Sequence, residues 1–473
     1  MNTTPPNATQ ASRADSLGEN PKALLRKYDV AAPRYTSYPP VPYWGEVTHE
    51  NVEGWLAEPS QASEPTLSLY FHVPFCTSRC TYCGCFVIIT PDKTQGGRYV
   101  EAVKQEMRLV RQYTKDSRPV RQLHLGGGTP TFISPDEMAD LVGTAIQEFP
   151  LAENPEMSIE VDPRTVNEFY LTKLREIGFN RISFGVQDFD SKVMKAVNRE
   201  QPFPLVEKTV EIARRLGFLS VNCDLIYGLP EQNMESFNHT LEQVEQLRPD
   251  RLAIYNYAHL PRINPYQRRI DESTLPGPEE KTEIFLMARK RLADVGYVPI
   301  GLDHFSLPED ELTQAFQAGT MRRNFMGYAT QAGTDMLSFG ISSISEFNRS
   351  FWQNEKKLNR YYDSLDAGRL PVVKGMELSP DDLLRKDVVS SLFCAGGVNF
   401  AEMGERHGVN FTDYFQQELS ELPPLAEDGL IELNQERIRV TDRGQLFLRN
   451  VAMLFDAYLR KGAEGGPQFS RAL

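Results

Sequence analysis

Short runs of apolar residues alternate with longer amphipathic stretches from about residue 67 onward. The apolar runs, which predict strands, are residues 67–73, 122–125, 158–161, 182–186, 221–226 and 252–257, with a weaker run at 297–301. Between them, apolar residues recur every three or four positions, as Tyr99, Val103 and Met107 illustrate, and this spacing is typical of one buried helix face. Helices are predicted over residues 135–148, 166–177, 206–216, 236–247 and 279–295. Strands that alternate with helices indicate βαβ units and a parallel sheet.

The number of these units predicts the fold. Six or seven strand–helix units in about 240 residues are typical of a partial or closed (β/α) barrel, whose functional residues follow the carboxyl ends of the strands. Polar or glycine-containing segments follow the six clear strands, at residues 74–85, 126–129, 160–163, 187–188, 224–230 and 256–259. We therefore expect an α/β barrel domain over residues 51–350, with a single active site at that edge.

The alternation stops near residue 350, where a different kind of structure is expected. Ser379 and Pro380 are typical of a helix cap and a first helical residue. Helices are predicted over residues 382–393, 411–422 and 441–459, with a hairpin at 430–440. Residues 351–473 are therefore interpreted as a mainly α-helical C-terminal domain.

Residues 1–50 precede the barrel and lack its pattern. Residues 1–20 are rich in Asn, Thr, Ser and Pro, which is typical of a mobile tail. Residues 34–40 contain two prolines and predict an extended segment. We interpret this region as a tail followed by a lid-like segment that could fold over the barrel mouth.

Composition and charge restrict the partners and the compartment. The 473-residue chain carries 51 Lys and Arg against 64 Asp and Glu, a formal net charge of −13. An acidic chain binds nucleic acid and anionic membranes poorly, so we expect neither as a partner. No apolar stretch approaches the roughly 18 residues of a membrane span, and no signal peptide is recognisable. These features predict a cytoplasmic protein, and we expect a monomer.

Four of the six cysteines lie within ten residues, in the pattern Cys76-x3-Cys80-x2-Cys83-x-Cys85. In a reducing compartment such a group indicates a metal site and not a set of disulfides. Zinc modules usually supply two separated ligand pairs, whereas three thiolates on one loop suit a [4Fe–4S] cluster that keeps one iron open. A structural zinc knuckle, or simply buried thiols, is the alternative. Cys85 is not needed as a fourth ligand.

Other candidate residues stand at the ends of the predicted strands. Residues 126–128 are glycines, which let backbone amides approach a ligand closely but are equally typical of a tight turn. Glu160 and Asp162 offer carboxylates to hydroxyl groups or an ammonium, with a helix cap as the alternative. Tyr70 and Tyr82 flank the cysteine loop and either pack on a ligand or belong to the core. No histidine is assigned as a catalytic base.

The motifs taken together resemble those of a known family. The CxxxCxxC spacing, with Tyr82 before the third cysteine, is similar to that of the radical S-adenosylmethionine (SAM) superfamily. Longer motifs are residues 34–39 (RYTSYP), 126–131 (GGGTPT), 159–164 (IEVDPR), 185–188 (GVQD), 198–201 (NREQ), 224–230 (DLIYGLP), 257–260 (YAHL) and 468–471 (QFSR). They resemble the oxygen-independent coproporphyrinogen III oxidases, from about residue 27 to residue 471.

This resemblance implies a radical SAM type of barrel and a set of cofactors. A [4Fe–4S] cluster on Cys76, Cys80 and Cys83 would bind SAM through its open iron, and two SAM molecules are implied per site. The implied SAM contacts are Tyr70, Tyr82, Gly127, Gly128, Thr129, Glu160, Gln187, Arg199, Asp224, Ala258 and Ile344. Of these, Gly127 and Glu160 are implied for the first SAM, and Gly128, Thr129, Gln187, Arg199 and Asp224 for the second. No catalytic residue beyond the cluster and SAM is implied.

The implied reaction is the anaerobic oxidative decarboxylation of two propionates of coproporphyrinogen III to vinyl groups, which gives protoporphyrinogen IX in porphyrin and haem biosynthesis. A 5′-deoxyadenosyl radical made from SAM would carry it, and the protein would supply positioning and electrostatics. An electron donor such as a flavodoxin or ferredoxin is also implied. The anionic substrate needs local cations, for which Arg34, Arg164, Arg322 and Arg323 are candidates, with plain surface charge as the alternative.

Three other functions share part of the pattern. A haem-trafficking relative of the same family binds haem without decarboxylation, but such relatives generally lack the fourth cysteine and the NREQ motif at residues 198–201. A radical SAM methyltransferase would use the second SAM as a methyl donor. A zinc-stabilised interaction protein would contain zinc without iron or acid-labile sulfide.

Overall fold

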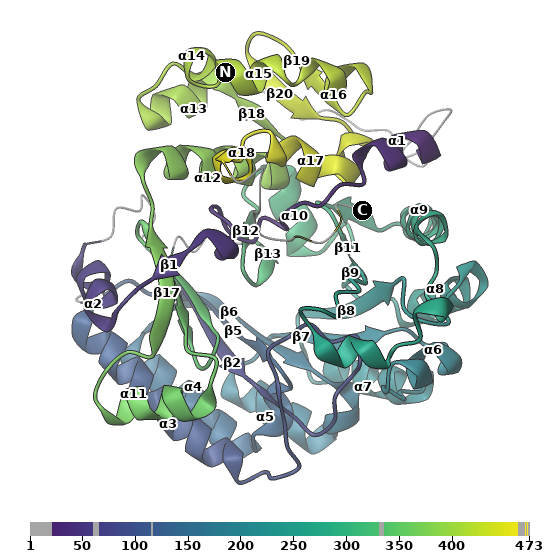
Figure 1. The fold of residues 1–473 in the computed structure, drawn as a ribbon. Helices are drawn as coiled ribbons and strands as arrows, with labels where there is room; N and C mark the ends of the chain where they lie inside the picture. The colour runs from purple at the N-terminus through teal and green to yellow at the C-terminus, as the bar shows by residue number, and fades with distance from the viewer. Residues whose placement is uncertain are drawn as a thin grey trace.

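The computed structural model of the chain describes residues 21–59, 66–114, 117–330, 335–461, 469 and 471. The expected mobile tail, residues 1–20, lies outside them. A thirteen-stranded sheet forms the centre of the larger part of the molecule (Figure 1), in the spatial order β1-β17-β16-β15-β14-β2-β5-β6-β7-β8-β9-β11-β10. No helix among the described residues is long and apolar enough to cross a membrane.

Seven neighbouring strands of this sheet run parallel. In spatial order they are β14 (Asp335–Phe339), β2 (Leu67–Val73), β5 (Val120–Gly127), β6 (Leu151–Val161), β7 (Arg181–Gln187), β8 (Ser220–Tyr227) and β9 (Arg251–Asn256). The last six correspond to the six clear apolar runs of the sequence. Among the described strands, the outermost ones, β1 (Gly45–Glu46) and β10 (Val298–Ile300), each pair with one neighbour only. The barrel is therefore partial and open, not closed.

The weak run at residues 297–301 has a different role from the other six. It contains β10, which pairs antiparallel with β11 (His304–Ser306), and β11 in turn pairs antiparallel with β9. The seventh parallel strand is instead β14, which pairs with β2 at the start of the barrel. The sequence pattern misses β14 because the regular repeat is broken before it: after β11 come helix α10 (Glu311–Ala318) and a short hairpin, β12 (Arg322–Asn324) and β13 (Gly327–Ala329).

Helices cover the outer face of the parallel strands (Figure 1). They are α3 (Gln95–Tyr113), α4 (Pro135–Glu148), α5 (Glu168–Ile177), α6 (Ser191–Ala196), α7 (Phe203–Arg215), α8 (Met234–Leu247) and α9 (Pro278–Asp294). Helix α4 has the predicted bounds because Ser134 and Glu137 form a reciprocal capping box at its start. Its apolar face is buried in the main core, as the spacing of Met138, Leu141 and Val142 requires.

The sheet continues past residue 350. Strands β15 (Ile344–Phe347), β16 (Ser350–Asn354) and β17 (Val372–Glu377) extend it antiparallel from β14, and β1 pairs with β17 at the edge. Helix α11 (Leu358–Asp366) connects β16 to β17, and α2 (His49–Ala57) follows β1. These strands carry the sheet beyond the expected boundary at residue 350, and the division of the chain into three domains stays a prediction.

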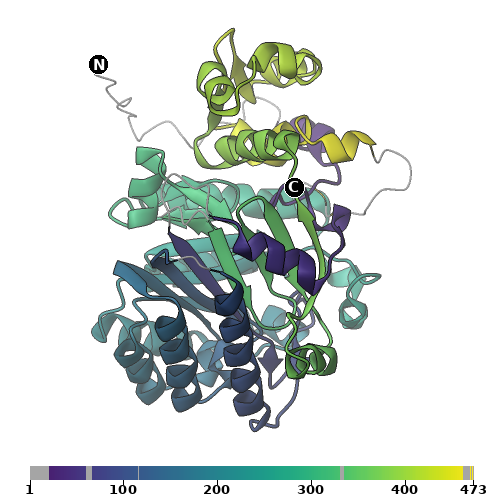
Figure 2. The ribbon, with the colours of Figure 1, turned by 90° about the vertical axis from the view of Figure 1, so that its left-hand side faces the viewer.

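Residues after Glu377 form a smaller, mainly helical region above the barrel (Figures 1 and 2). Its elements are α12 (Pro380–Cys394), β18 (Gly397–Asn399), α13 (Phe400–His407), α14 (Phe411–Tyr414), α15 (Gln416–Ser420), α16 (Pro423–Glu427), β19 (Ile431–Leu433), β20 (Arg437–Val440), a 3-10 turn Gly444–Phe447, α17 (Leu448–Met453) and α18 (Ala457–Lys461). The predicted hairpin is β19–β20, to which β18 adds a third strand. The predicted helices at 411–422 and 441–459 are each divided into shorter pieces.

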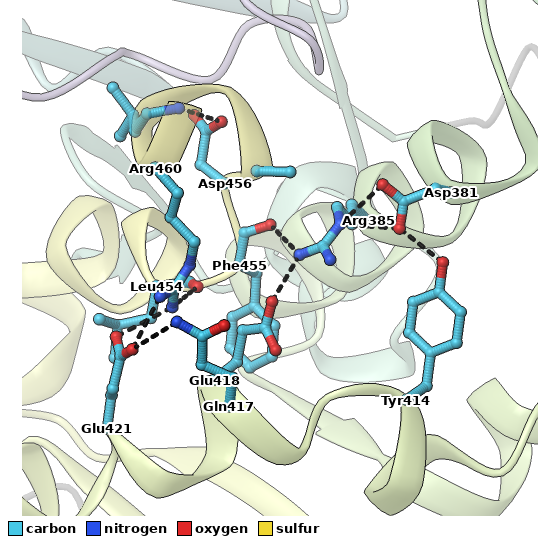
Figure 3. A network of polar contacts seen from close by, with 12 residues as sticks. Asp381, Arg385, Tyr414, Gln417, Glu418, Glu421, Leu454, Phe455, Asp456 and Arg460 are labelled. Carbon is cyan, nitrogen blue, oxygen red and sulfur yellow. Dashed lines mark hydrogen bonds and ion pairs between the residues drawn. The ribbon is translucent and has the colours of Figure 1, made fainter. Parts of the chain in front are cut away.

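Buried polar groups cause the second of these divisions (Figure 3). Asp456 lies between α17 and α18, where its carboxylate accepts hydrogen bonds from the backbone of Tyr458 and Leu459. Arg385 on α12 donates to the carbonyl of Phe455 and to the buried carboxylate of Glu418. In a single helix through residues 441–459, the carbonyl of Phe455 would accept a hydrogen bond from the amide of Leu459. It would then not be available to Arg385.

The N-terminal segment lies between the barrel and the C-terminal region (Figure 1). Helix α1 (Pro21–Tyr28) leads into it, and Asn450 on α17 donates to the carbonyl of Tyr28 at 2.8 Å. Arg449, next to it, donates to the carbonyls of Ala32 and Pro33. Ala31 forms a backbone bridge with Arg471, so both ends of the described chain meet there.

Candidate active site

A cavity of about 1500 Å³ opens at the carboxyl ends of the parallel strands. It gathers nearly all of the residues singled out in the sequence: Tyr82, Cys76, Cys80, Cys83, Gly127, Gly128, Thr129, Glu160, Gln187, Arg199, Asp224 and Ala258 all line it. Residues from both flanks complete its wall, with Arg34 and Thr36 from the N-terminal segment and Arg449 from α17. The expected lid-like segment therefore borders the cavity, and its movement stays a prediction.

Backbone hydrogen bonds hold the cysteine loop at the bottom of this cavity. Strand β3 (Phe75–Cys76) begins the loop and pairs with β4 (Ile88–Ile89), which ends it. The amide of Cys83 donates to the carbonyl of Cys80 at 3.2 Å, and this turn brings the second and third cysteines of the motif to one end of the loop. The loop is thus closed at its base, and its thiols face the cavity.

The surroundings of the thiols fit a cluster with three thiolate ligands. The Arg199 guanidinium donates to the Cys80 sulfur at 3.6 Å, and Thr129 and Cys76 share a hydrogen bond of 3.2 Å. A hydrogen bond from Cys85 lowers the pKa of the Cys83 thiol to about 6, whereas burial raises the pKa of Cys76 to about 11. Cys85 also lines the cavity, and its exclusion from the ligand set stays a prediction.

The geometry also bears on the kind of metal centre. Within the described ranges, no three His, Cys, Asp or Glu side chains converge so as to hold a single metal ion. A four-iron cubane does not require such convergence, because each thiolate binds a different iron atom. The residues present therefore fit a [4Fe–4S] cluster.

The glycine segment lies directly against the cysteine loop. The amide of Gly128 donates to the carbonyl of Val73 at 2.8 Å, and the amide of Thr129 donates to the carbonyl of Phe75 at 2.9 Å. A Cβ at Gly128 would lie 2.7 Å from the backbone of Pro74. At Gly127, where φ is +114°, a Cβ would lie 2.6 Å from the His72 ring. These glycines are required by close packing of two backbones, not by a tight turn alone.

Glu160, at the end of β6, is the best-supported anionic group of the cavity wall. Its carboxylate accepts from the amide of Gly127 at 3.2 Å and lies 3.5 Å from the Nε2 atom of His124. Burial alone would raise the pKa of Glu160, but the hydrogen bond and charge of His124 and the Gly127 amide together hold it below its usual value. The carboxylate is therefore ionised at neutral pH and accepts hydrogen bonds from a ligand.

Asp224, on the neighbouring part of the wall, has the opposite character. It accepts hydrogen bonds from Asn222 at 2.8 Å and from Ser183 at 3.1 Å. Burial, together with the nearby charge of Glu160, raises its pKa to about 6. Glu160 is thus firmly ionised, whereas Asp224 takes up a proton in weakly acidic solution.

Asp162 links two of the arginines and has a structural role as well. Its carboxylate accepts from Arg164 at 2.7 Å and from Arg199 at 3.1 Å, and it also accepts from the Arg164 amide as the cap of a 3-10 turn. The helix-cap alternative considered from the sequence therefore holds for Asp162. Arg199 donates further to the carbonyl of Gly185 at 2.6 Å, so its guanidinium is fixed beside Cys80.

Two of the implied SAM contacts do not line the cavity. Tyr70 on β2 stacks against the His124 ring and shares a hydrogen bond with His72 at 3.1 Å, so it packs behind Glu160. Ile344 on β15 packs against Trp44 and Phe351, in a small apolar cluster at the edge of the sheet. For both residues, contact with SAM stays a prediction.

Two further polar residues of the cavity wall are Asn256, which belongs to the strand-end segment 256–259 singled out in the sequence, and Lys281, which the sequence analysis did not identify. Asn256, at the end of β9, has a buried side-chain oxygen without a hydrogen-bond partner among the described residues. Lys281 on α9 donates to the carbonyl of Tyr257 at 2.9 Å, and burial lowers its pKa to about 8. The position of Asn256 after a predicted strand was a usable signal, whereas Lys281 is typical of a solvated helix face.

Known proteins match the chain over nearly its whole length. A profile of the Radical SAM superfamily matches residues 70–244, and a profile of the HemN C-terminal domain matches residues 378–447. A protein from Synechocystis sp., named oxygen-independent coproporphyrinogen III oxidase, is 42% identical over 95% of this chain and 97% of its own length. A protein of the same name from Escherichia coli K12 is also 42% identical, over 95% of this chain and 98% of its own.

A solved structure gives the same result at the level of the fold. It is described as coproporphyrinogen III oxidase from Escherichia coli, a radical SAM enzyme. The TM-score is 0.87 at 40% identity, and the match covers 92% of this chain and 98% of that one.

Replacing Gly128 with alanine should disrupt the cysteine loop. The new Cβ would meet the Pro74 backbone at 2.7 Å, which cannot move without displacing the loop, and we expect a cost of about 1–3 kcal/mol and a severalfold lower iron content after reconstitution. The control is Gly143→Ala on α4, where the Cβ meets open space and better helix propensity should stabilise by about 1 kcal/mol. Thermal unfolding and iron and sulfide analysis measure both variants. Equal iron content in the two would contradict the close-packing argument.

Replacing Asp224 with asparagine should change how stability depends on pH. Because the folded-state pKa of about 6 lies above the unfolded value, the stabilising contribution of Asp224 is complete below about pH 4 and is lost as the pH rises through 6. The variant should therefore be more stable than the parent by about 1–2 kcal/mol at pH 8, and the difference should shrink toward pH 4. Denaturant unfolding of the cofactor-free chains measures this. If the free energies of unfolding of parent and variant changed in parallel with pH, the folded state would not disfavour the charge of Asp224.

Proposed function

The chain belongs to the oxygen-independent coproporphyrinogen III oxidases of the radical SAM superfamily, and we propose that the cavity at the carboxyl ends of its strands is the site of their reaction. As a member of that family the protein is a radical SAM oxidoreductase that decarboxylates coproporphyrinogen oxidatively and anaerobically, with a [4Fe–4S] cluster and SAM as cofactors. One observation carries the placement of the reaction. A single cavity gathers Cys76, Cys80 and Cys83 together with Glu160 and Asp224.

We assign the cluster to Cys76, Cys80 and Cys83. Held there and reduced, the cluster would supply the one-electron chemistry that cleaves SAM and so starts the oxidation of a substrate propionate. The protein residues orient these groups and balance their charge. Arg199 offsets negative charge at Cys80, and Thr129 lies within hydrogen-bond distance of Cys76.

Glu160 is proposed to bind the first SAM together with Gly127. Its ionised carboxylate suits the ammonium or the ribose hydroxyls of SAM, and the Gly127 amide orients that carboxylate through a hydrogen bond of 3.2 Å. A second SAM is proposed next to Gln187, Arg199 and Asp224, which line the same cavity. The volume of about 1500 Å³ exceeds the 300–1,000 Å³ of ordinary ligand sites, which supports a site for more than one large ligand.

The protein is further proposed to act as a cytoplasmic monomer that takes electrons from a flavodoxin or ferredoxin. None of the six cysteines forms a disulfide, which supports a reducing compartment. Nucleic acid and membranes are not proposed as partners, because the net charge of the chain is −13.

Product analysis tests the proposed function. Cluster-reconstituted protein, incubated without oxygen with coproporphyrinogen III, SAM and dithionite, should give protoporphyrinogen IX and 5′-deoxyadenosine. Cys76→Ala should abolish both products because the cluster loses one of three ligands, whereas Cys394→Ala, in the core of the C-terminal region, should retain them. Chromatography separates the porphyrins and nucleosides. Cleavage of SAM without a vinyl product would contradict the proposed substrate, and binding of haem without cleavage would favour haem trafficking.

Arg34 is proposed to bind a propionate of the substrate. Several cavity arginines already donate to protein groups, since Arg164 is held by Asp162 and Arg323 donates to the carbonyls of Arg34 and Tyr35. Arg322 does not line the cavity. The exposed Arg34 side chain lines the cavity and makes no hydrogen bond or ion pair within the described part of the chain. Burial raises the pKa of nearby Asp303, but His304 and, to a smaller extent, the charge of Arg34 lower it.

Replacing Arg34 with glutamine should therefore weaken substrate binding specifically. Loss of one charged hydrogen bond of about 1.5–3 kcal/mol predicts a KM for coproporphyrinogen III that is roughly 10- to 100-fold higher. Binding of SAM, measured separately by calorimetry, should stay the same. Arg322→Gln is the matched control, and equal KM values for the two variants would exclude Arg34 as a substrate ligand.

A further inference from the structure

The segment after β9, residues 260–270, packs directly on the cysteine loop. Asn264 donates to the carbonyl of Cys83 at 2.6 Å, and Gln267 donates to the carbonyl of Tyr82 at 3.4 Å. From the loop side, the Arg79 guanidinium stacks 3.8 Å from the centre of the Tyr266 ring. The outer surface of this segment is therefore the protein surface next to the third cysteine of the motif.

Three arginines on this segment, Arg262, Arg268 and Arg269, form what we call the arginine patch. All three are exposed, and none makes an ion pair or hydrogen bond through its side chain within the described residues; Arg269 only lies over the Tyr266 ring, at 5.5 Å. The acidic residues that follow are already engaged. Asp271 accepts from Ser273, and Glu272 pairs with His259.

Three unpaired arginines within eight residues distinguish this segment. The net charge of the chain is −13, and several exposed arginines elsewhere do have carboxylate partners, as in the pairs Arg215–Glu168, Arg369–Glu50 and Arg439–Glu432. A group of free cations on an acidic protein creates a local field that attracts an acidic partner.

The patch also has an apolar centre. Tyr266 is 41% exposed, and Ile263, which also borders the cavity, is 65% exposed; both lie between Arg262 and Arg268 in sequence. Large apolar side chains on the surface that are bordered by arginine are typical of protein interfaces, in which aromatic residues and arginine are enriched and a polar rim surrounds an apolar core.

We propose that the arginine patch, with Ile263 and Tyr266 at its centre, is the docking site for an acidic one-electron carrier protein. The inference rests on the proposed function, which requires an electron for each SAM cleaved. Asn264 and Gln267 connect the patch to the backbone of the cysteine loop through single hydrogen bonds. In the complex the carrier is oxidised by one electron and the cluster held by the loop is reduced by one electron, with no covalent bond formed or broken.

Binding of a carrier tests the docking site by a readout other than activity. The probe is an acidic flavodoxin, titrated into the cluster-reconstituted chain in a calorimeter at several ionic strengths. The variant with Arg262→Glu, Arg268→Glu and Arg269→Glu should raise the Kd at least tenfold and remove the weakening of binding by salt that the parent shows. The control variant with Lys208→Glu, Lys356→Glu and Arg437→Glu has the same change in net charge at exposed sites elsewhere, and its Kd should stay within twofold of the parent.

Turnover then separates the docking site from the proposed function. With dithionite as the reductant the patch variant should form product at the parent rate, whereas with reduced flavodoxin its kcat/KM for the carrier should fall at least tenfold.

A second variant, with Arg262→Gln, Arg268→Gln and Arg269→Gln, keeps the side-chain size and tests the docking site if charge reversal prevents folding. Its Kd for flavodoxin should rise at least threefold. A parent-like Kd in the folded patch variants would overturn the docking site, whereas absence of product with dithionite in the parent would overturn the proposed function alone.

Discussion

The backbone of residues 73–75 and the backbone of residues 127–129 approach each other so closely that no side chain fits between them. The amides of Gly128 and Thr129 donate to the carbonyls of Val73 and Phe75, and these two contacts join the end of β5 to the start of the cysteine loop. The loop has little secondary structure of its own, so its position depends on this junction. Glu160 is tied to the same junction through the amide of Gly127. The cysteines and the first carboxylate of the cavity are thus fixed relative to each other by backbone geometry.

Most charged side chains of the cavity are paired with other protein groups. This pairing explains how a chain with an acidic composition can have a cavity for an anionic substrate. Asp162 is held between Arg164 and Arg199, Asp224 is hydrogen-bonded to Asn222 and Ser183, and Glu160, whose pKa is lowered, accepts from the amide of Gly127 in the glycine segment. Positive charge is similarly committed, because most cavity arginines hold protein carbonyls or carboxylates. The local field in the cavity therefore differs from the field implied by a net charge of −13.

The sequence predicted the six strands and the site residues that follow them, because hydrophobic periodicity and the carboxyl-end rule are both local signals. It did not predict β14, since an extra hairpin between α10 and β14 breaks the repeat, nor the division of the last helix, which depends on the local contacts of Asp456 and on Arg385, a residue distant in sequence. It also gave no reason to expect Lys281 in the cavity, because its burial depends on how α9 packs across the ends of β8 and β9. The cysteine motif, in contrast, was recognisable because all of its cysteines lie within one loop.

The two ends of the described chain meet at the mouth of the cavity. Residues 28, 32 and 33 are held there by Asn450 and Arg449, and Ala31 pairs with Arg471. During synthesis, the barrel strands leave the ribosome well before the residues that hold the N-terminal segment in place. The wall that carries Arg34 is therefore assembled last, after the cysteine loop and its glycine support have formed, so a nascent chain passes through a stage in which the future cofactor site is still open to solvent on that side.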